Sequence, residues 1–349
     1  MGLRINVRMK GKATSIDIAH LAGVSQATVS RALRGSPLVN EETRRRIQAA
    51  VEQLNYKVDK NASNLRRMYS GTLALLLFED PTADESHINP FFLSMLGSIT
   101  RACAQQGYDL LISFQQFSRD WHADFADSKK ADGIILLGYG DYLAYRDKLE
   151  KLVAQGTCFV RWGAVLPDQP GVSIGCDNFH GGYAIAGHLL ERGCRRIAFL
   201  GDASSHYPEF FERYRGYVDA LQQAGVAVDP ALQENAESTE CSGYEAMDAL
   251  IKREIAFDAV FAASDLIAIG ALRALSVHGL RVPQDVALAG FDDIAMASFV
   301  NPPLTTVLQD TRQAGEVLVD SLLKLIRAEP VESAILPAKL IVRRSSLRG

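Results

Sequence analysis

The sequence predicts an α/β protein in which a short all-α module precedes a two-lobed body of doubly wound parallel sheet. From Gly71 onward, short apolar runs alternate with amphipathic stretches, the pattern of buried strands joined by crossover helices. The roughly 280 residues of this pattern exceed one comfortable sheet, so two lobes are expected. Between Thr14 and Tyr56 the sequence has three short helical patterns with capping residues instead.

These patterns set the expected domain boundaries. We place the helical module at residues 1–57, a connector at 58–70 and the body at 71–349. Within the body, lobe 1 is expected at about 71–163 plus 304–328, and lobe 2 at about 172–300 plus 330–345.

Composition excludes several classes of protein. With 349 residues, 48% of them apolar and 22% charged, the chain is too hydrophobic for disorder. Its apolar stretches fall far short of the roughly 18 residues that a membrane span needs. The first twelve residues lack the apolar core of a secretory signal, and the five cysteines are scattered without a C-x-x-C pair. We therefore expect a cytoplasmic protein with reduced thiols and no membrane partner.

The charge is distributed unevenly along the chain. Residues 1–70 contain 13 Lys or Arg and 5 Asp or Glu, which leaves 24 and 36 of the totals of 37 and 41 for the remainder. The net charges are therefore +8 for the head and −12 for the body. A compact basic head attracts phosphates and releases counterions on binding, whereas the acidic body is repelled by them. Nucleic acid is the expected partner of the head.

The head is predicted to fold as three helices. Thr14, Ser25 and Asn40 are N-cap residue types, and Gly23 and Gly35 are placed to end the first two helices. Because these patterns are periodic and capped, the head is not interpreted as a solvated basic tail. The predicted inward faces consist of Ile18, Leu21 and Ala22, then Val29, Ala32 and Leu33, then Ile47, Val51 and Leu54.

The outward face of the second helix is compact and polar. A major groove of B-DNA admits a helix and presents guanine O6 and N7 to arginine and base edges to glutamine. The spacing of Ala19, Gly23 and Val29 is that of a helix-turn-helix, whose second helix lies in this groove. The outward residues are Gln26, Ala27, Ser30, Arg31 and Arg34.

The whole segment from Ala13 to Tyr56, ATSIDIAHLAGVSQATVSRALRGSPLVNEETRRRIQAAVEQLNY, closely resembles the DNA-binding headpiece of the lactose and galactose repressor (LacI/GalR) family. The resemblance implies double-stranded operator DNA as the partner and Gln26, Ala27 and Arg31 as base-reading residues. It also implies phosphate contacts, made or supported by Thr14, Ser15, Ser25, Thr28, Ser30 and Asn40.

The segment Lys57–Arg67 that follows, KVDKNASNLRR, has few apolar residues and four basic ones, including Lys60. In the family this stretch forms a short hinge helix on DNA, and the position of Leu65 inserts into the central minor groove. An apolar wedge of this kind unstacks a base step and bends the duplex. Val58 replaces the proline usual in the family, which implies a less rigid start of the hinge.

In the body, polar residues directly follow several apolar runs. Ligands of open parallel sheets bind beyond the carboxyl ends of the strands, so such residues are candidates for a ligand site. The set comprises Glu79, Asp80, Tyr139, Asp141, Arg161, Trp162, Ser264, Asp265, Asp292 and Asp293.

The body resembles the periplasmic-binding-protein-like effector domain of the same family over nearly its whole length. The matching motifs are NPFF at Asn89–Phe92, RYRGY at Arg213–Tyr217, SD at Ser264 with Ala268 and Gly270, GFDD at Gly290–Asp293, and PLTTV at Pro303–Val307 with Gln309. The resemblance implies that Arg213 and Asp292 bond effector hydroxyls, with Ser264 assisting. A guanidinium and a carboxylate can grip vicinal hydroxyls, and an aromatic side chain can stack on a sugar ring.

The expected effector is therefore a sugar or sugar derivative bound between the lobes of a homodimer. We expect a repressor of carbohydrate-utilisation genes, with corepressor or activator logic kept as an alternative. The expected effector-binding residues are Phe78, Asn89, Phe91, Tyr139, Arg161, Trp162, Arg213, Ser264, Asp292 and Gln309.

Other interpretations of these residues remain open at this stage. Asp292 and Asp293 could simply cap the next helix, and Trp162 could be a core residue. Arg161 stands where some members of the family that the chain resembles have a carboxylate or another polar residue, which leaves open an acidic or phosphorylated effector. A transport receptor shares the two-lobed body, but the missing secretion signal and the basic head disfavour it.

The sequence gives no support to an enzyme. No phosphate-binding G-x-x-x-x-G-K-[ST] and no H-E-x-x-H is present, and a nucleophile elbow is not expected. We expect no catalytic residues, no cofactor and no metal, and we interpret His188 and His278 as structural.

Overall fold

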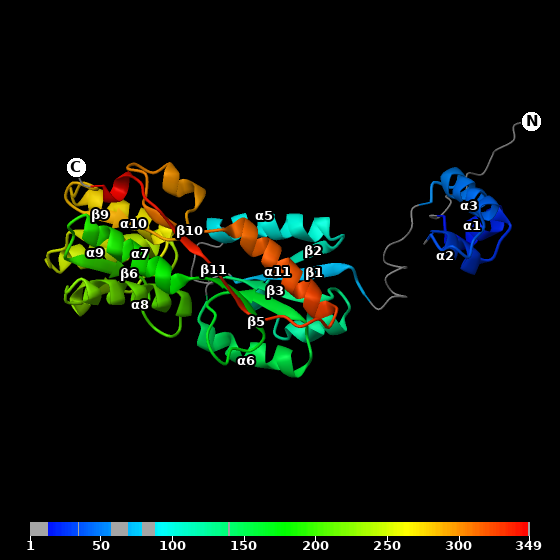
Figure 1. The fold of residues 1–349 in the computed structure, drawn as a ribbon, viewed down its shortest axis with the longest axis horizontal. Coiled ribbons are helices and arrows are strands. Elements are labelled where there is room, and N and C mark those ends of the chain that lie inside the picture. Colours follow the sequence, from blue (N-terminus) through cyan, green and yellow to red (C-terminus); the bar gives the residue numbers. More distant parts are fainter. Residues whose placement is uncertain (1–12, 34, 57–68, 79–87, 139, 348–349) are drawn as a thin grey trace, which may run out of the picture. The chain divides into compact units, whose positions relative to one another are not determined.

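The computed structural model describes residues 13–33, 35–56, 69–78, 88–138 and 140–347. The chain divides into two compact units, Met1–Met68 and Tyr69–Gly349 (Figure 1). This division falls inside the expected connector. The first unit is helical, and the second contains the parallel sheets.

The first unit contains α1 (Ser15–Ala22), α2 (Gln26–Leu33) and α3 (Glu41–Gln53). Thr14 and Asp17 form a reciprocal capping box at α1, and Gly23 ends this helix with a φ of 63°. The Asn40 side chain caps α3 through the Thr43 N–H at 2.8 Å. Leu21 was predicted to face inward, but it is 43% exposed. The small core of this unit consists of Ile18, Ala19, Ala22, Val29, Ala32, Val39, Ile47 and Ala50.

The first lobe of the second unit is a six-stranded parallel sheet in the order β11-β5-β4-β3-β1-β2. Its strands are β1 (Thr72–Leu77), β2 (Asp109–Phe114), β3 (Gly133–Leu137), β4 (Phe159–Trp162), β5 (Val172–Cys176) and β11 (Ala334–Leu336). Its helices are α5 (Pro90–Gln105), α6 (Tyr142–Ala154) and α11 (Thr311–Ile326), with short turns η1 (Gln115–Phe117) and η2 (His122–Asp127).

Helices cover both faces of this sheet, as the sequence pattern predicted. In β1, Leu73 and Leu75 belong to the cluster that includes side chains of α5 and α11. Ala74 and Leu76 belong to a second cluster, formed with residues of α6 and η2. Figure 1 shows α5 and α11 on one side of the sheet and α6 on the other. The alternation along one strand therefore produces the doubly wound architecture.

The second lobe contains a four-stranded parallel sheet in the order β7-β6-β8-β9. Helices α7 and α8 pack against each other, as do α9 and α10. The elements are α7 (Asn178–Glu191), β6 (Ile197–Leu200), α8 (Pro208–Gln223), η3 (Pro230–Leu232), β7 (Gln233–Glu234), α9 (Glu240–Lys252), β8 (Ala259–Ala262), α10 (Asp265–Val277), β9 (Ala287–Ala289) and η4 (Ala295–Ser298).

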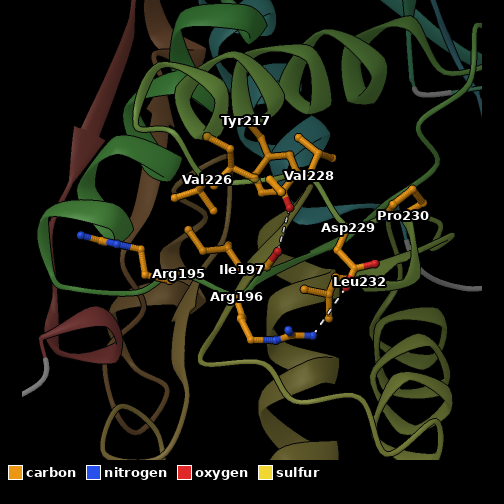
Figure 2. A pocket seen from close by; sticks show the side chains of 11 residues that line it. Arg195, Arg196, Ile197, Tyr217, Val226, Val228, Asp229, Pro230 and Leu232 are labelled. Atoms are coloured by element: carbon orange, nitrogen blue, oxygen red, sulfur yellow. Dashed lines mark hydrogen bonds and ion pairs between the residues drawn. The ribbon is translucent and has the colours of Figure 1, made fainter.

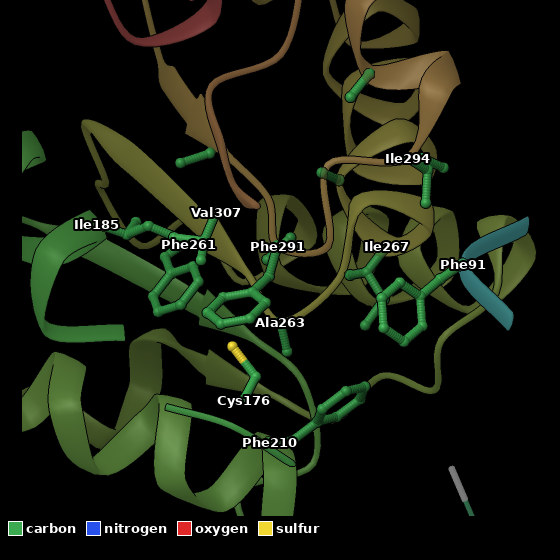
Figure 3. Packing of buried hydrophobic residues seen from close by; sticks show 14 of the residues in the cluster. Phe91, Cys176, Ile185, Phe210, Phe261, Ala263, Ile267, Phe291, Ile294 and Val307 are labelled. Atoms are coloured by element: carbon green, nitrogen blue, oxygen red, sulfur yellow. The ribbon is translucent and has the colours of Figure 1, made fainter. Parts of the chain in front are cut away.

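The remaining elements are β10 (Thr306–Gln309), β12 (Ala338–Ile341) and η5 (Arg344–Ser346). β10 and β12 pair antiparallel, and single bridges join Thr305 to Ala289 and Leu308 to Asp292. One buried apolar cluster includes residues of both lobes, among them Phe91, Phe210 and Phe291 (Figure 3).

The lobe boundaries differ from those expected. β5 was assigned to lobe 2, which was to begin at about 172, but it pairs with β4 and β11 in the first sheet. β11 was likewise expected in lobe 2. Residues 304–309 were expected in lobe 1, whereas they bridge to the second lobe. The cause is that β11 has only three residues and that Ser173 and Gly175 interrupt the apolar pattern of β5, so neither strand produces a clear signal.

β2 also departs from the expectation of strands buried on both faces. It is the edge strand of the first sheet, and Leu111 and Ile112 are 37% and 48% exposed. Two further apolar side chains are exposed nearby along the chain, Leu93 on α5 and Phe117 on η1. This edge is a candidate surface for association.

Candidate functional site

The second helix of the headpiece presents the expected reading face. Gln26, Ala27 and Arg31 are exposed on α2. The Gln26 amide donates to the Ser15 hydroxyl at 2.8 Å, which fixes the start of α2 against the start of α1. The major groove of B-DNA is wide enough to admit an α-helix, and exposed Gln and Arg side chains on such a helix can bond base edges there.

The expected phosphate-contacting residues lie mainly at helix N-termini. Thr14 and Asn40 cap α1 and α3, and the Ser25 hydroxyl accepts the Thr28 N–H at 3.2 Å. N-terminal N–H groups and the helix dipole attract phosphate oxygens. Ser30 is half-buried on α2. Three other expected DNA contacts, Arg34, Lys60 and Leu65, lie outside the described residues.

In the second lobe, Arg213 is fully buried on α8. Its guanidinium donates to Asn178 Oδ1 at 2.9 Å and to the Ala263 carbonyl at 2.5 Å, and it lies 3.8 Å from the centre of the Phe291 ring. Its Nη1 is 3.7 Å from Asp292 Oδ1. This buried ion pair is the centre of the expected effector site.

Two glycines allow α8 to approach α7 closely enough to place this guanidinium. A Cβ on Gly216 would lie 2.0 Å from the Phe179 carbonyl oxygen, and one on Gly182 would lie 2.1 Å from the Arg213 carbonyl oxygen. Because backbone atoms form both contacts, neither position tolerates a side chain without moving a helix.

Asp292 follows β9 and has an unusual backbone conformation. Its φ of 117° is seldom adopted by L-residues, and its N–H donates to the Val307 carbonyl at 2.9 Å. The Gln309 amide donates to Asp292 Oδ1 at 2.6 Å. Burial raises the pKa of Asp292 to about 7, although Arg213 and the Gln309 hydrogen bond act to lower it. Desolvation therefore outweighs the two neighbouring groups that favour the charged form of the Asp292 carboxyl.

A hydrogen-bonded chain joins the lobes beside this pair. The Ser264 side chain caps α10 and accepts from Ser238 at 2.9 Å, and the Asn89 amide donates to Ser238 at 3.1 Å. Asn89 belongs to the first lobe, where its side chain also caps α5 through the Phe91 N–H. Burial and the nearby Asp292 raise the pKa of Asp265 well above its ordinary value.

Arg161 lies in the first lobe at the end of β4, buried to 2% exposure. Its guanidinium donates to Ser173 Oγ at 2.7 Å, to the Ala164 carbonyl at 2.9 Å and to the Tyr145 hydroxyl at 3.3 Å. Burial raises the pKa of Tyr145, so this phenol stays neutral. A small cavity here is lined by Phe78, Gln115, Leu136, Leu137, Gly138, Tyr145, Arg161 and Trp162.

Trp162 is only 4% exposed, and its ring lies 6.1 Å from that of Phe91 in a tilted contact. Packing in the core therefore explains the position of Trp162 in this structure. A ligand could reach only the part of its side chain that lines the small cavity. Of the expected effector-binding residues, the structure gathers Arg213, Asp292 and Gln309 in one cluster and Asn89 and Ser264 in a second. Phe78, Arg161 and Trp162 form a third with Phe91 beside it, and Tyr139 is outside the described residues.

Several residues of this site were not predicted from the sequence. Asn178 lies two residues after the end of β5, and the same search for polar residues after strands would have found it had β5 been recognised. Glu209 lies four residues before Arg213 on α8, and its carboxylate accepts the Ala164 N–H at 2.7 Å. Tyr145 and Gln115 carry no local sequence signal, because only the tertiary fold brings them to the cavity.

A separate cavity of about 420 Å³ lies in the second lobe at the start of β6 (Figure 2). Its polar groups bind one another: the Tyr217 hydroxyl donates to the Ile197 carbonyl at 2.7 Å, and Arg196 pairs with Asp229 at 3.5 Å. No expected effector residue lines it. We assign it no ligand.

One sequence expectation about enzyme motifs was wrong. A G-x-S-x-G pattern is present at Gly171–Gly175, but Ser173 is fully buried in β5 and accepts the Arg161 Nε–H. A nucleophile elbow needs an exposed serine on a strand-to-helix turn, so this pattern is not one. Within the described ranges, no group of three potential metal ligands and no membrane-spanning helix occurs.

Comparisons with known proteins agree with this architecture. Residues 15–59 match the model of bacterial regulatory proteins of the lacI family, and residues 186–346 match the periplasmic binding protein-like domain. The HTH-type transcriptional regulator CelR of Thermobifida fusca is 32% identical over 335 residues, or 94% of this chain and 96% of CelR. The chain belongs to the lacI family.

Solved structures of lacI-family proteins cover nearly the whole chain. A CelR–cellobiose complex is 31% identical, with a TM-score of 0.70, and covers 95% of this chain and 99% of its own. The lac repressor dimer bound to operator and the anti-inducer ONPF is 25% identical, with a TM-score of 0.82, and covers 97% and 100%.

Family membership confirms the central expectations from sequence. The protein is a DNA-binding transcriptional regulator with a helix-turn-helix headpiece and a two-lobed periplasmic-binding-protein-like body. Proteins of the lacI family are transcriptional regulators and not enzymes, which agrees with the expectation that this protein is not an enzyme.

Proposed function

We propose that this regulator is a cytoplasmic repressor of carbohydrate-utilisation genes, controlled by a sugar bound between its lobes. The observation that carries the proposal is the buried Arg213–Asp292 pair, with Gln309 bonded to the same carboxylate. A guanidinium and a carboxylate held side by side can donate to and accept from neighbouring hydroxyls of one sugar. The relative solved with cellobiose supports this effector class.

The proposed base-reading residues are Gln26, Ala27 and Arg31, with the helix N-termini around Thr14, Ser25 and Asn40 holding phosphates. Their exposure on α2 and their capping positions support these roles. Binding to a near-palindromic operator follows if two copies present this face together.

We further propose that the chain acts as a homodimer, with the exposed edge at β2 as part of the interface. Leu111 and Ile112 leave apolar surface and an unpaired strand edge exposed, which a second copy would cover. The lac repressor relative, solved as a dimer on operator, supports this assembly.

Control by the effector requires different effector affinities in two lobe arrangements. The coupling is typically ~1–3 kcal/mol, and DNA must change the affinity for effector by the same factor. The same linkage applies to a corepressor, which would strengthen operator binding instead of weakening it.

The test is fluorescence anisotropy on a selected operator, titrated with neutral sugars that include cellobiose. Asp292→Ala is expected to keep operator binding and to lose the effector response. Arg215→Ala, an exposed change on α8, is the control. An unchanged response in Asp292→Ala would show that the site is elsewhere.

A further inference from the structure

Two oppositely charged side chains from different lobes are buried around Gly163. Arg161, on β4 of the first lobe, is 2% exposed, and Glu209, on α8 of the second lobe, is 7% exposed. We call these two residues the interlobe charge pair. Burying a charged group costs free energy unless an opposite charge or hydrogen bonds compensate it. The groups that surround Arg161 and Glu209 therefore decide how much this burial costs.

The first lobe holds Arg161 in place but gives it no negative charge. Its three hydrogen-bond acceptors are the Ser173 hydroxyl, the Tyr145 hydroxyl and the Ala164 carbonyl, all neutral. In the described part of the chain, no carboxylate oxygen of Asp or Glu is recorded within 4.0 Å of its guanidinium. The lobe therefore presents a fixed, buried positive charge toward the space between the lobes.

The second lobe supplies the compensating charge through Glu209. Its Oε1 accepts the Ala164 N–H at 2.7 Å, a hydrogen bond from one lobe to the other. Glu209 lies in the first turn of α8, where the helix dipole stabilises a negative charge. Its carboxylate therefore binds a backbone N–H of the first lobe near the Arg161 guanidinium, without direct contact with that guanidinium.

Gly163 shows how closely the pair approaches. A Cβ on this residue would lie 2.8 Å from Glu209 Oε1 and 3.6 Å from Arg161 Nη1. Both charged groups therefore face the same small volume beside the backbone of Gly163. A methyl group there would displace the Glu209 carboxylate, which is the mobile end of a side chain.

A guanidinium beside a free backbone N–H is a typical site for a carboxylate or phosphate. Here the Glu209 carboxylate already accepts that N–H and lies near the guanidinium, so an added anion would meet a like charge. We infer that Glu209 determines the charge class of the effector: it excludes anionic sugars from Arg161 and restricts the interlobe site to neutral, polyhydroxylated ligands.

This inference rests on the proposed function and answers the question that Arg161 raised in the sequence. From the sequence alone, Arg161 left open an acidic or phosphorylated effector. With Glu209 opposite, the charges on the two lobes balance, and each end of the site offers one guanidinium and one carboxylate, Arg161 with Glu209 and Arg213 with Asp292. Hydroxyl groups can bond both members of such a pair, whereas an added anion is repelled by the carboxylate.

The test uses inorganic phosphate as the probe, so it does not depend on knowing the sugar. Phosphate is titrated calorimetrically into the full-length wild type, Glu209→Gln and Glu209→Ala at pH 7.5. Glu209→Gln removes the charge but keeps an oxygen that accepts the Ala164 N–H, and Glu209→Ala also vacates the space. Phosphate affinity is expected to rise at least about tenfold in Glu209→Ala, because a like charge within ~6 Å is removed. A smaller rise is expected in Glu209→Gln.

A double variant, Arg161→Met with Glu209→Ala, separates this site from phosphate binding by the basic headpiece. It is expected to return phosphate affinity to the wild-type value. Gly163→Ala should raise phosphate affinity by less than Glu209→Ala, because its methyl group displaces the carboxylate but leaves the negative charge nearby. Melting temperatures establish that each variant is folded.

Equal phosphate affinity in the wild type and both folded Glu209 variants would overturn the inference, as would a gain that the double variant retains. A second arm compares glucose with glucuronate, where Glu209→Ala should shift the preference toward the acid. The charge-class inference and the sugar-effector proposal fail separately. A phosphate gain without any sugar response leaves only the effector proposal refuted, and a sugar response without the gain refutes only the role of Glu209.

Discussion

Replacing Arg213 by methionine removes the guanidinium and keeps a side chain of similar length beside Phe291. The variant loses the hydrogen bonds to Asn178 and Ala263 and leaves Asp292 buried without its counterion. Removal of one partner of a buried ion pair typically costs about 3–5 kcal/mol. At about 2 °C per kcal/mol for a body of this size, the melting temperature should fall by about 6–10 °C.

The loss should also depend on pH in a defined direction. Burial raises the pKa of Asp292 from 3.8 to about 7, so the folded state holds this proton more tightly than the unfolded chain. The stability associated with this group is therefore complete below pH 3.8, declines as pH rises and levels off above about 7. Without Arg213 the pKa of Asp292 rises further, and the decline continues above pH 7 by about 1.4 kcal/mol per pH unit. Destabilisation by Arg213→Met should thus be larger at pH 8.5 than at pH 6.

Thermal and denaturant unfolding at the two pH values measure both effects. Arg215→Met is the matched control, because Arg215 lies on the same helix but pairs with Glu212 at the surface. Adding Asp292→Leu to Arg213→Met should recover part of the loss, since no uncompensated buried charge then remains. A loss no larger than that of Arg215→Met, or one independent of pH, would refute this account of the pair.

Three further predictions concern the headpiece, the helix pair and the dimer. Arg31→Ala should cost about 1–3 kcal/mol of operator affinity and reduce the preference for particular bases, whereas Lys60→Ala should weaken binding to all sequences alike. Gel shifts at several salt concentrations measure both effects. Equal losses of affinity on every sequence for Arg31→Ala would contradict base reading by Arg31. Gly216→Ala should cost about 1–3 kcal/mol or more and reduce effector binding in calorimetry, because its methyl group meets the backbone of α7; wild-type stability would contradict the close packing. Ile112→Glu should shift sedimentation from dimer to monomer, and an unchanged dimer would place the interface elsewhere.

Much of the fold could be predicted from the sequence because local signals were strong. The caps at Thr14 and Asn40 and the stop at Gly23 lie where the sequence placed them, since capping depends on neighbouring residues only. The long apolar runs, such as that of β1, likewise identify buried parallel strands. Leu21 was wrongly predicted to face inward, because the burial of an apolar residue at the edge of a helical face depends on which neighbours pack there.

The site was predictable only in part. Arg213, Asp292 and Gln309 carry motif signals, and the structure brings them together. Glu209 has no such signal, because its importance arises from a contact between residues 45 positions apart on different lobes. The weak strand β5 concealed both the lobe boundary and Asn178, since a serine and a glycine, Ser173 and Gly175, interrupt its apolar pattern.

The most direct measurement of the central claim is affinity selection of randomised DNA duplexes by the full-length protein, with and without a panel of neutral sugars. The account predicts enrichment of one near-palindromic sequence, release of that sequence by at least one sugar, and no release from Asp292→Ala. Retention of all duplexes alike at every salt concentration, with no dependence on any sugar, would contradict it.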